Sequence, residues 1–213
     1  RDVWAGAGWR AAMQGVPRVR AWGRVGVVSR CYAGHAEAGR SNGFVGREVL
    51  EHEVDRFIDA LDVLVVVNPN NPTGLSLAPE RLLEWHARLA QRGGWLVVDE
   101  AFMDNTPAQS LAPHVERPGL IVLRSFGKFF GLAGVRLGFV VAEHSLLLRL
   151  AELLGPWTVS GPTRVLAQAS LADHATQYVQ TQRCAAASQR LAAVLRGAGL
   201  APSGGCDLFQ YVR

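Results

Sequence analysis

Short apolar runs rich in valine recur through the first two thirds of the chain, and they constrain its fold more than any other feature. Each run is bounded by turn-forming residues, and the runs are residues 24–29, 61–67, 94–100 and 120–125, followed by 137–143. Runs of this length and continuity are typical of strands that are buried on both faces of a parallel sheet. A mostly parallel sheet is therefore the expected centre of the molecule.

The segment between the second and third runs has the period of an amphipathic helix. Leu82, Trp85 and Leu89 fall on one helical stripe, Ser76 is the expected N-cap, and Gly93 is expected to end the helix. A strand, a helix and a second strand in this order form a βαβ unit with parallel strands. The sequence predicts an α/β fold.

The pattern becomes helical from Ser145 onward. Two shorter helices are expected over residues 145–155 and 161–175, and a long one over 176–199, before a new strand begins near the end of the chain. We interpret the long helix as a bridge between a first domain, residues 1–174, and the start of a second, residues 175–213. Because the chain begins with Arg and stops within the predicted strand, we expect it to lack sequence at both ends.

Composition argues against several classes of partner. The 213 residues carry a net charge of +4 without any basic run, which does not favour nucleic acid but suits a small phosphorylated ligand. No stretch approaches the roughly 20 apolar residues of a membrane span, and no signal peptide is evident, so we expect a cytoplasmic protein. The three cysteines lie far apart without metal-ligand spacing, which predicts free, mostly buried thiols and no metal site.

Lys128 is the only lysine in the chain, whereas the other 21 basic residues are arginines. A position that needed only a positive charge or a phosphate ligand would be served equally well by Arg, whose guanidinium stays protonated. A primary amine can lose its proton and condense with an aldehyde, which a guanidinium cannot do. Lys128 is thus the first candidate for a Schiff-base residue.

Polar residues follow three of the predicted strands directly. They lie in "NPNNPTG" (68–74), "DEAF" (99–102) and "SFGK" (125–128). Ligands of open parallel sheets bind beyond the carboxyl ends of the strands, so these segments are expected to meet. They would bring an amide, a carboxylate and an amine to one site.

These three motifs, in this order, resemble those of the class I and II aminotransferases that depend on pyridoxal 5'-phosphate (PLP). The resemblance runs from about residue 8 to residue 213. It implies the large domain of an aspartate aminotransferase-like PLP-dependent transferase, followed by the start of a small C-terminal α+β domain. It also implies PLP as cofactor and a homodimer, because a partner subunit completes the site in this family.

The resemblance assigns a role to each matching residue. Lys128 would hold the cofactor and carry a proton, and Asp99 would pair with the pyridine nitrogen. The other cofactor-binding positions are Asn71 at the phenolic oxygen, Tyr32 on the ring, Ser125 and Arg136 at the phosphate, and the loop Gly8, Trp9 and Arg10 at a helix start. Glu100 is expected to point away from the site on an extended backbone, and Asn68 and Asn70 to satisfy turn backbone. The resemblance also implies a cis peptide bond before Pro72.

Two positions depart from the family pattern. Phe102 occupies a place where many relatives have a Tyr that bonds the phenolic oxygen, so the cofactor would be tuned differently. Trp9 and Arg10 occupy a loop that usually holds small or polar residues after its glycine. A helix N-terminus still offers N–H groups to a phosphate there, and Arg10 adds charge.

Residues 124–139 and 155–173 most resemble the threonine-phosphate decarboxylases of cobalamin biosynthesis. This branch implies the decarboxylation of L-threonine O-3-phosphate to (R)-1-amino-2-propanol O-2-phosphate. One alternative is an aminotransferase acting on histidinol phosphate, and another is an inactive protein with a truncated PLP fold that only binds a partner or cofactor. A nucleotide-binding domain is excluded because no G-x-G-x-x-G follows the first strand.

Overall fold

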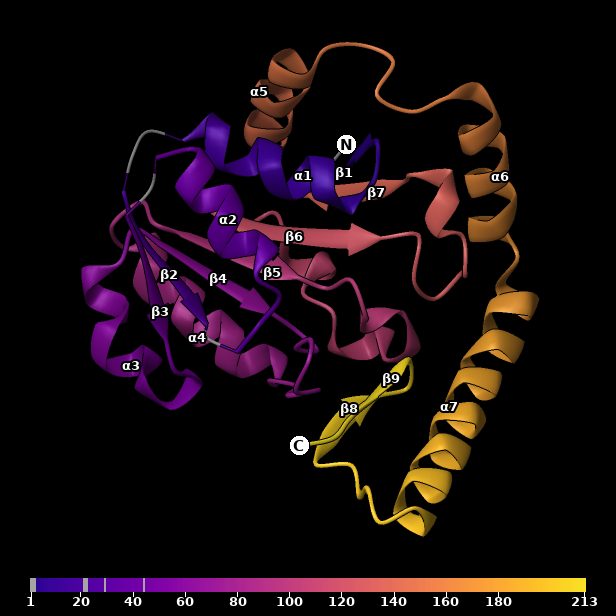
Figure 1. Cartoon of the computed structure of the whole chain (residues 1–213). Helices are drawn as coiled ribbons and strands as arrows, with labels where there is room; N and C mark the ends of the chain where they lie inside the picture. Colours follow the sequence, from indigo (N-terminus) through magenta and orange to yellow (C-terminus); the bar gives the residue numbers. More distant parts are fainter. Residues whose placement is uncertain (1–2, 21–22, 29, 44) are drawn as a thin grey trace.

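The computed structural model describes residues 3–20, 23–28, 30–43 and 45–213, and its centre is one sheet (Figure 1). Within these ranges the sheet has seven strands in the order β1-β7-β6-β5-β4-β2-β3. The strands are β1 (Val3–Gly6), β2 (Arg24–Val28), β3 (Val45–Val49), β4 (Val63–Val67), β5 (Trp95–Asp99), β6 (Leu120–Ser125) and β7 (Gly138–Val141). β3, β2, β4, β5 and β6 are mutually parallel. β7 is antiparallel to both of its neighbours, β6 and β1, so β1 runs in the same direction as the five parallel strands.

The predicted strands are confirmed as β2, β4, β5, β6 and β7, except that Ser29 lies outside the described residues. The sequence did not predict β1 and β3, which form the two edges of the sheet. An edge strand has only one paired neighbour and often carries charge, as Arg47 and Glu48 do in β3, so it lacks the continuous apolar run of a central strand. The prediction was therefore confined to the interior of the sheet.

Helices cover both faces of the sheet. They are α1 (Trp9–Gly15), α2 (Gly34–Ser41), α3 (Val54–Phe57), α4 (Pro79–Ala90) and α5 (His144–Leu154). Side chains of α1, α2 and α5 pack in one core with alternate residues of the strands, and those of α3 and α4 pack in a second core on the other face. Burial on both faces explains why the central strands are apolar at every position.

The N-cap prediction for α4 was wrong. The helix begins at Pro79 with Ala78 as its N-cap, and the Ser76 hydroxyl instead contacts Gln109 Oε1 at 3.2 Å. Proline has a fixed φ and lacks an N–H, which makes it favourable at the first helical position. Gly93 follows the last turn with φ of 65°, as predicted for a helix end.

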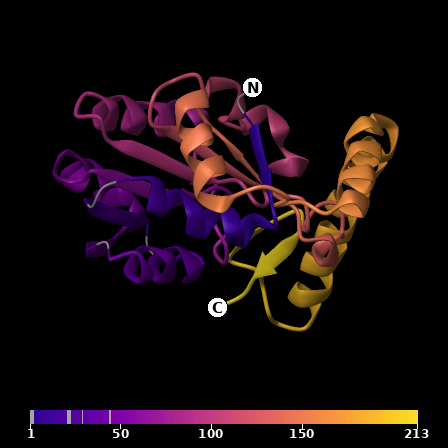
Figure 2. The ribbon, with the colours of Figure 1, turned by 90° about the horizontal axis from the view of Figure 1, so that it is seen from above.

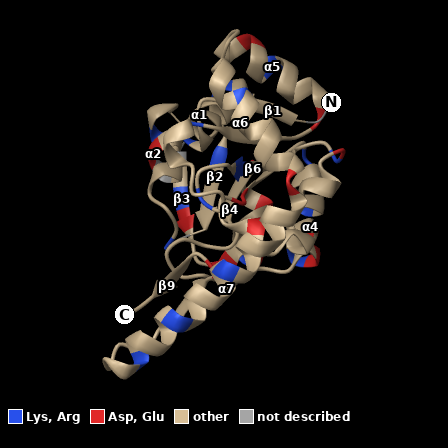
Figure 3. Ribbon diagram, turned by 90° about the vertical axis from the view of Figure 1, so that its right-hand side faces the viewer, with Lys and Arg blue, Asp and Glu red and all other residues tan. Residues whose placement is uncertain are grey.

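The C-terminal part lies to one side of the sheet (Figures 1 and 2). It comprises α6 (Gly161–Ala172), α7 (His174–Gly197) and the antiparallel hairpin of β8 (Gly204–Cys206) and β9 (Phe209–Tyr211). α7 begins two residues before its predicted start because Asp173 caps it, accepting from Thr176 N at 2.9 Å. Its charged side chains are arginines alone (Figure 3).

The hairpin packs against the turn that follows β4. A Cβ added to Gly74 would lie 2.2 Å from the nitrogen of Gly205, so the two backbones touch. The rings of Phe102 and Phe209 meet edge to face with centroids 5.1 Å apart. None of the described helices is both long and apolar enough to cross a membrane.

The cysteine prediction was only partly right. Cys31, Cys184 and Cys206 are free, but each is half-buried rather than buried. Burial still raises the pKa of the Cys31 thiol to about 11, with the negative charge of Asp99 adding to this effect. The thiolate of Cys31 is therefore disfavoured at neutral pH.

Candidate active site

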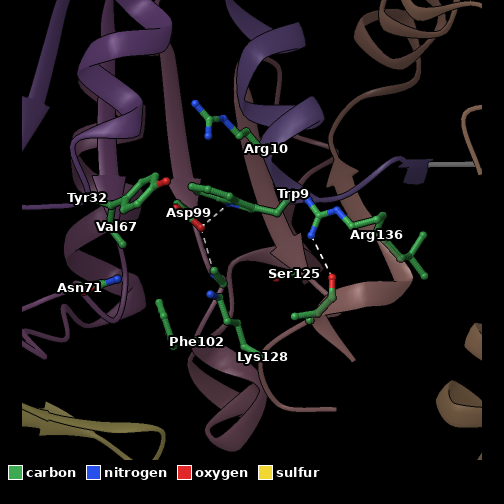
Figure 4. A pocket seen from close by; sticks show the side chains of 14 residues that line it. Trp9, Arg10, Tyr32, Val67, Asn71, Asp99, Phe102, Ser125, Lys128 and Arg136 are labelled. Atoms are coloured by element: carbon green, nitrogen blue, oxygen red, sulfur yellow. Dashed lines mark hydrogen bonds between the residues drawn. The ribbon is translucent and has the colours of Figure 1, made fainter. Parts of the chain in front are cut away.

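A cavity of about 230 Å³ opens beyond the carboxyl ends of β4, β5 and β6, with the start of α1 on its other side (Figure 4). Every predicted site residue except Gly8 lines it, namely Trp9, Arg10, Tyr32, Asn71, Asp99, Ser125, Lys128 and Arg136. The parallel strands bring these residues together because they all end at the same edge of the sheet.

Asp99 ends β5 with a side chain that is almost wholly buried, at 1% exposure. Its Oδ1 accepts hydrogen bonds from Trp9 Nε1 at 2.8 Å and from the backbone N–H of Ala101 at 3.0 Å. Its Oδ2 lies 2.7 Å from Nε2 of His35. A buried carboxylate needs such partners, since an unpaired one would be very costly.

Glu100 points to the opposite face, as predicted. Its carboxylate accepts from the Ser110 hydroxyl, from the Leu111 backbone N–H at 2.7 Å and from Arg124 Nη1 at 3.1 Å. Arg124 also donates to Asp104 Oδ1 at 2.6 Å. Burial raises the pKa of Glu100, and the bonds from Ser110 and Leu111 oppose this shift. Glu100 thus belongs to a buried ion cluster of Glu100, Arg124 and Asp104 outside the cavity.

Lys128 lies in the loop after β6 and extends its amine into the cavity (Figure 4). Its Nζ is 5.5 Å from the ring centroid of Phe102, within range of a cation–π contact. Phe102 presents a ring without a hydroxyl at this point, so the amine faces an apolar surface on one side. An exposed primary amine in such a position can react with a carbonyl compound that enters the cavity.

Ser125 and Arg136 lie at the end of the cavity away from Asp99 (Figure 4), and the backbone of Gly8 lies beside the Arg136 guanidinium. The Arg136 guanidinium points toward the Ser125 side chain, and its Nη1 donates to the Ala133 carbonyl at 2.9 Å. Gly8 has φ of 91°, and a Cβ there would lie 2.6 Å from Nη2 of Arg136. The positive φ therefore favours glycine at residue 8, and a side chain there would displace the guanidinium of Arg136.

The three asparagines after β4 have different surroundings. Asn68 accepts from the backbone of Leu77 at 2.8 Å, and Asn70 donates to the carbonyl of Arg30 at 2.9 Å, so both stabilise the turn. Asn71 is the asparagine that lines the cavity. The peptide bonds before Pro69 and Pro72 are both cis.

Trp9 and Arg10 differ in how they meet the cavity. The Trp9 ring packs edge to face on Tyr32 and His35, with centroids 5.3 and 5.5 Å away, and its N–H reaches Asp99. Arg10 directs its guanidinium away from Arg136 (Figure 4) and lies 3.7 Å from a Glu37 carboxylate oxygen. The structure thus does not bring Arg10 to the end of the cavity formed by Ser125 and Arg136.

His35 is a site residue that sequence reasoning missed. It is buried in α2, 6% exposed, with its ring against Asp99. The available signal was a histidine near the start of the segment after the first strand, at the edge where Asp99 was expected. Nothing in the one-dimensional pattern indicated that α2 would turn this ring toward β5.

The arrangement provides opposite charges at two ends of one cavity and an amine between them. Asp99 can hold a protonated nitrogen, Arg136 and Ser125 can bind a phosphate, and Lys128 can react with a carbonyl carbon. In the described part of the chain, no three His, Cys, Asp or Glu side chains gather as a metal site would require.

The sequence matches the model of a known family, Aminotransferase class I and II, over residues 3–211. The chain belongs to this aminotransferase family. The fold and the resemblance predicted from the sequence are thereby confirmed. Among curated relatives, threonine-phosphate decarboxylase from Pseudomonas aeruginosa is 61% identical over 204 residues, 96% of this chain and 62% of the relative.

Other members of the family are similar at lower identity. Threonine-phosphate decarboxylase from a Sinorhizobium species is 42% identical and matches 96% of this chain and 61% of its own length. Histidinol-phosphate aminotransferase from Streptomyces avermitilis is 36% identical and matches 65% of this chain and 38% of its own length. The chain thus spans about three fifths of the two decarboxylases.

Solved structures share the fold. L-Threonine-O-3-phosphate decarboxylase from Porphyromonas gingivalis superposes with a TM-score of 0.83 at 20% identity, over 96% of this chain and 67% of that one. Histidinol-phosphate aminotransferase from Sinorhizobium meliloti, in complex with PLP, has a TM-score of 0.85 at 23% identity, over 97% of this chain and 60% of that one. The aminotransferase fold with its mostly parallel sheet is therefore the fold of this chain.

Proposed function

We propose that this chain binds PLP and forms the cofactor-binding part of a threonine-phosphate decarboxylase. The observation that carries the proposal is that one cavity joins Lys128, Asp99 and Arg136 in a chain 61% identical to the decarboxylase from Pseudomonas aeruginosa. The reaction type rests on that identity, and the cofactor rests on the cavity and on membership of the family.

The residues present fit PLP at both of its ends. The buried carboxylate of Asp99 would favour a proton on the pyridine nitrogen, since an opposite charge nearby stabilises the protonated form. Arg136 and Ser125 would bind the phosphate beside the backbone of Gly8, whose lack of a side chain leaves space next to the guanidinium. Arg10 would add positive charge at the rim.

The remaining lining residues would fix the ring between these ends. Asn71 would donate its amide to the phenolic oxygen, and Tyr32 would pack on the ring. Lys128 would hold the cofactor through its amine. Apart from Trp9, whose indole is bonded to Asp99 itself, we therefore keep the site residues predicted from the sequence as the proposed set that binds PLP, with His35 added as the residue that positions Asp99.

When bound, PLP supplies an electron sink for the pair of electrons left at Cα of an amino acid. In L-threonine O-3-phosphate the bond from Cα to the carboxylate breaks, CO2 leaves, and a proton added to Cα gives (R)-1-amino-2-propanol O-2-phosphate. The amine of Lys128 is the group on this chain that would hold and deliver that proton. The choice of the bond that breaks is a matter of orientation within the cavity.

The test is release of CO2 from carboxyl-labelled L-threonine O-3-phosphate by the whole protein that carries this chain, supplied with PLP. We expect release that is lost in Lys128→Ala. A protein that acquires the visible absorbance of bound PLP through Lys128 without releasing CO2 would overturn the decarboxylase. A protein that acquires no such absorbance would favour an inactive member of the fold.

A second candidate function is amino-group transfer from histidinol phosphate. It is favoured by the 36% identity to the aminotransferase from Streptomyces avermitilis. The same preparation would then consume histidinol phosphate in the presence of a keto acid and release no CO2. Phe102 counts against this candidate. The family pattern that histidinol-phosphate aminotransferases resemble has a Tyr at this position, whereas this chain has a ring without a hydroxyl.

We also propose that residues 1–174 form the cofactor-binding domain, that residues 175–213 begin a second domain, and that the protein is a cytoplasmic homodimer. Exposed apolar side chains on α6 and α7 support the dimer, with Val165 at 69% and Tyr178 at 69% exposure. The free cysteines support the location. Light scattering of the protein after gel filtration tests the dimer, since a monomer mass would contradict it.

A further inference from the structure

Two side chains donate to Asp99 from different directions. His35 reaches Oδ2 from α2 and borders a separate apolar hollow beneath that helix, not the cavity of the site. Trp9 reaches Oδ1 and lines the same cavity as Lys128 (Figure 4). The indole therefore approaches the carboxylate from the side on which a bound cofactor would lie.

The acceptor capacity of Oδ1 is already used. A carboxylate offers about four lone-pair sites, two on each oxygen. Oδ1 accepts from Trp9 Nε1 at 2.8 Å and from the Ala101 backbone N–H at 3.0 Å. The Ala101 bond belongs to the turn after β5 and is fixed by the backbone, so on Oδ1 only the bond from Trp9 can be exchanged.

The indole N–H and a protonated pyridine nitrogen are the same kind of donor. Each presents one N–H in the plane of a flat aromatic ring, and neither accepts a hydrogen bond in that form. We propose that Trp9 is an internal competitor of PLP for Asp99, so that the indole gives up Oδ1 when the pyridine nitrogen of the cofactor binds there. This inference rests on the proposed binding of PLP.

The exchange has to occur by rotation of the Trp9 side chain. A Cβ added to Gly138 would lie 2.3 Å from the backbone nitrogen of Trp9, so the start of α1 lies directly against β7 and has no room to shift toward it. The ring itself is only half-buried and contacts Tyr32 and His35 at its edges. The ring also packs at the border of the core beneath α1 and α2, and a half-buried ring at such a border can rotate while its backbone stays in place.

If PLP must first displace the indole, the free energy of the hydrogen bond between Trp9 and Asp99 is subtracted from the free energy of PLP binding. A hydrogen bond to a charged group contributes about 1.5–3 kcal/mol, so its removal is expected to tighten binding by about tenfold or more. Trp9→Phe keeps an aromatic ring at this position, although a smaller one, and removes the N–H. Trp9→Ser removes the whole ring and serves as the second variant. Trp157→Phe is the matched control, because Trp157 is 93% exposed and lies away from the cavity.

The experiment titrates PLP into the whole protein that carries this chain, with visible absorbance of the bound cofactor and tryptophan emission as two readouts. We expect Trp9→Phe and Trp9→Ser to bind PLP about tenfold or more tightly than the parent protein and Trp157→Phe. We also expect the change in emission on binding to shrink in the Trp9 variants and to persist in Trp157→Phe.

Each other outcome overturns the inference in a distinguishable way. Equal dissociation constants in all four proteins would leave PLP binding intact and refute competition. Weaker binding in both Trp9 variants would make Trp9 a residue that helps to hold the cofactor. No visible absorbance in any of the proteins would refute the proposed binding of PLP and the competition with it.

Discussion

At the end of β5, Asp99 faces the layer of α1 and α2, whereas Glu100, directly after the strand, faces the opposite side of the sheet. Asp99 lines the cavity and accepts hydrogen bonds from Trp9 and lies against His35. Glu100 is enclosed with Arg124 in the buried ion cluster. Two successive carboxylates, equally buried, thus have different surroundings because side chains alternate along a strand.

This difference shows that one sheet keeps the residues that line the cavity on one face and residues that stabilise the fold on the other. On the cavity side, the buried charge of Asp99 remains next to a space that a ligand can enter. On the other side, Arg124 pairs with both Glu100 and Asp104, and none of the three residues lines the cavity, so we expect them to act on the fold. Substitutions on the first side should change cofactor binding and rate, and substitutions on the second should change the free energy of unfolding.

The largest expected effect concerns the rate, on the cavity side. Lys128→Arg keeps the positive charge and removes the reactive amine, so CO2 release should fall about 10³-fold or more. The free energy of unfolding should change by less than about 0.5 kcal/mol, because Lys128 is exposed. Labelled CO2 release and urea unfolding measure the two quantities.

Arg183→Lys is the control for this substitution, since Arg183 is exposed on α7. It exchanges the same two residue types and should leave the rate unchanged. If Lys128→Arg retained the parent rate, Lys128 would not be the reactive amine. The assignment of catalysis to one face of the sheet and stability to the other would then lose its main support.

The next effect concerns stability, on the side of Glu100. Arg124→Met removes the cation of the buried ion cluster and leaves the carboxylates of Glu100 and Asp104 uncompensated. Loss of one partner of a buried ion pair costs about 3–5 kcal/mol. Arg24→Met, which breaks the exposed pair with Asp62, should cost less than about 1 kcal/mol. Equal losses in the two variants, measured by urea unfolding, would contradict this role of the cluster.

A pair of buried histidines provides a smaller but sharper comparison. His35→Phe keeps the ring packing against Trp9 and removes the contact with Asp99, so the dissociation constant of PLP should rise about tenfold. His86→Phe is the matched change on the other side, where His86 contacts the carbonyl of Pro118 at 3.0 Å. It should leave PLP binding unchanged. An equal loss of affinity in both variants would mean that the two sides are not independent.

The smallest effect is a dependence of stability on pH through His86. Burial lowers the pKa of His86 below its ordinary 6.5, and the bond to the Pro118 carbonyl opposes this shift. Because the unfolded chain binds the proton first, His86 should leave stability undiminished above pH 6.5 and reduce it as the pH falls from 6.5 toward the lower pKa of the folded state. The difference between the parent protein and His86→Gln isolates this contribution from those of the carboxylates. The stability of the parent protein relative to His86→Gln should therefore rise with pH up to about 6.5, and a relative stability that fell as the pH rose would contradict the assignment.

Much of the site could be predicted because its residues follow strands. A parallel sheet gathers the residues after each strand at one edge, so the positions of Asn71, Asp99, Ser125 and Lys128 in the sequence sufficed to place them together. The alternation of side chains along an extended backbone also sufficed to separate Asp99 from Glu100. The roles of these residues remain predictions that the experiments above would test.

The sequence by itself determined the central strands, the helix between the second and third of them, and the edge where polar residues meet, because period and order along the chain are local properties. Only the tertiary structure decided that β1 and β3 close the sheet, that Pro79 rather than Ser76 begins α4, and that His35 and Trp9 both reach Asp99. Those contacts join residues 64 and 90 positions apart. Such contacts depend on how the helices pack on the sheet, and the spacing of residues within one segment does not indicate that packing.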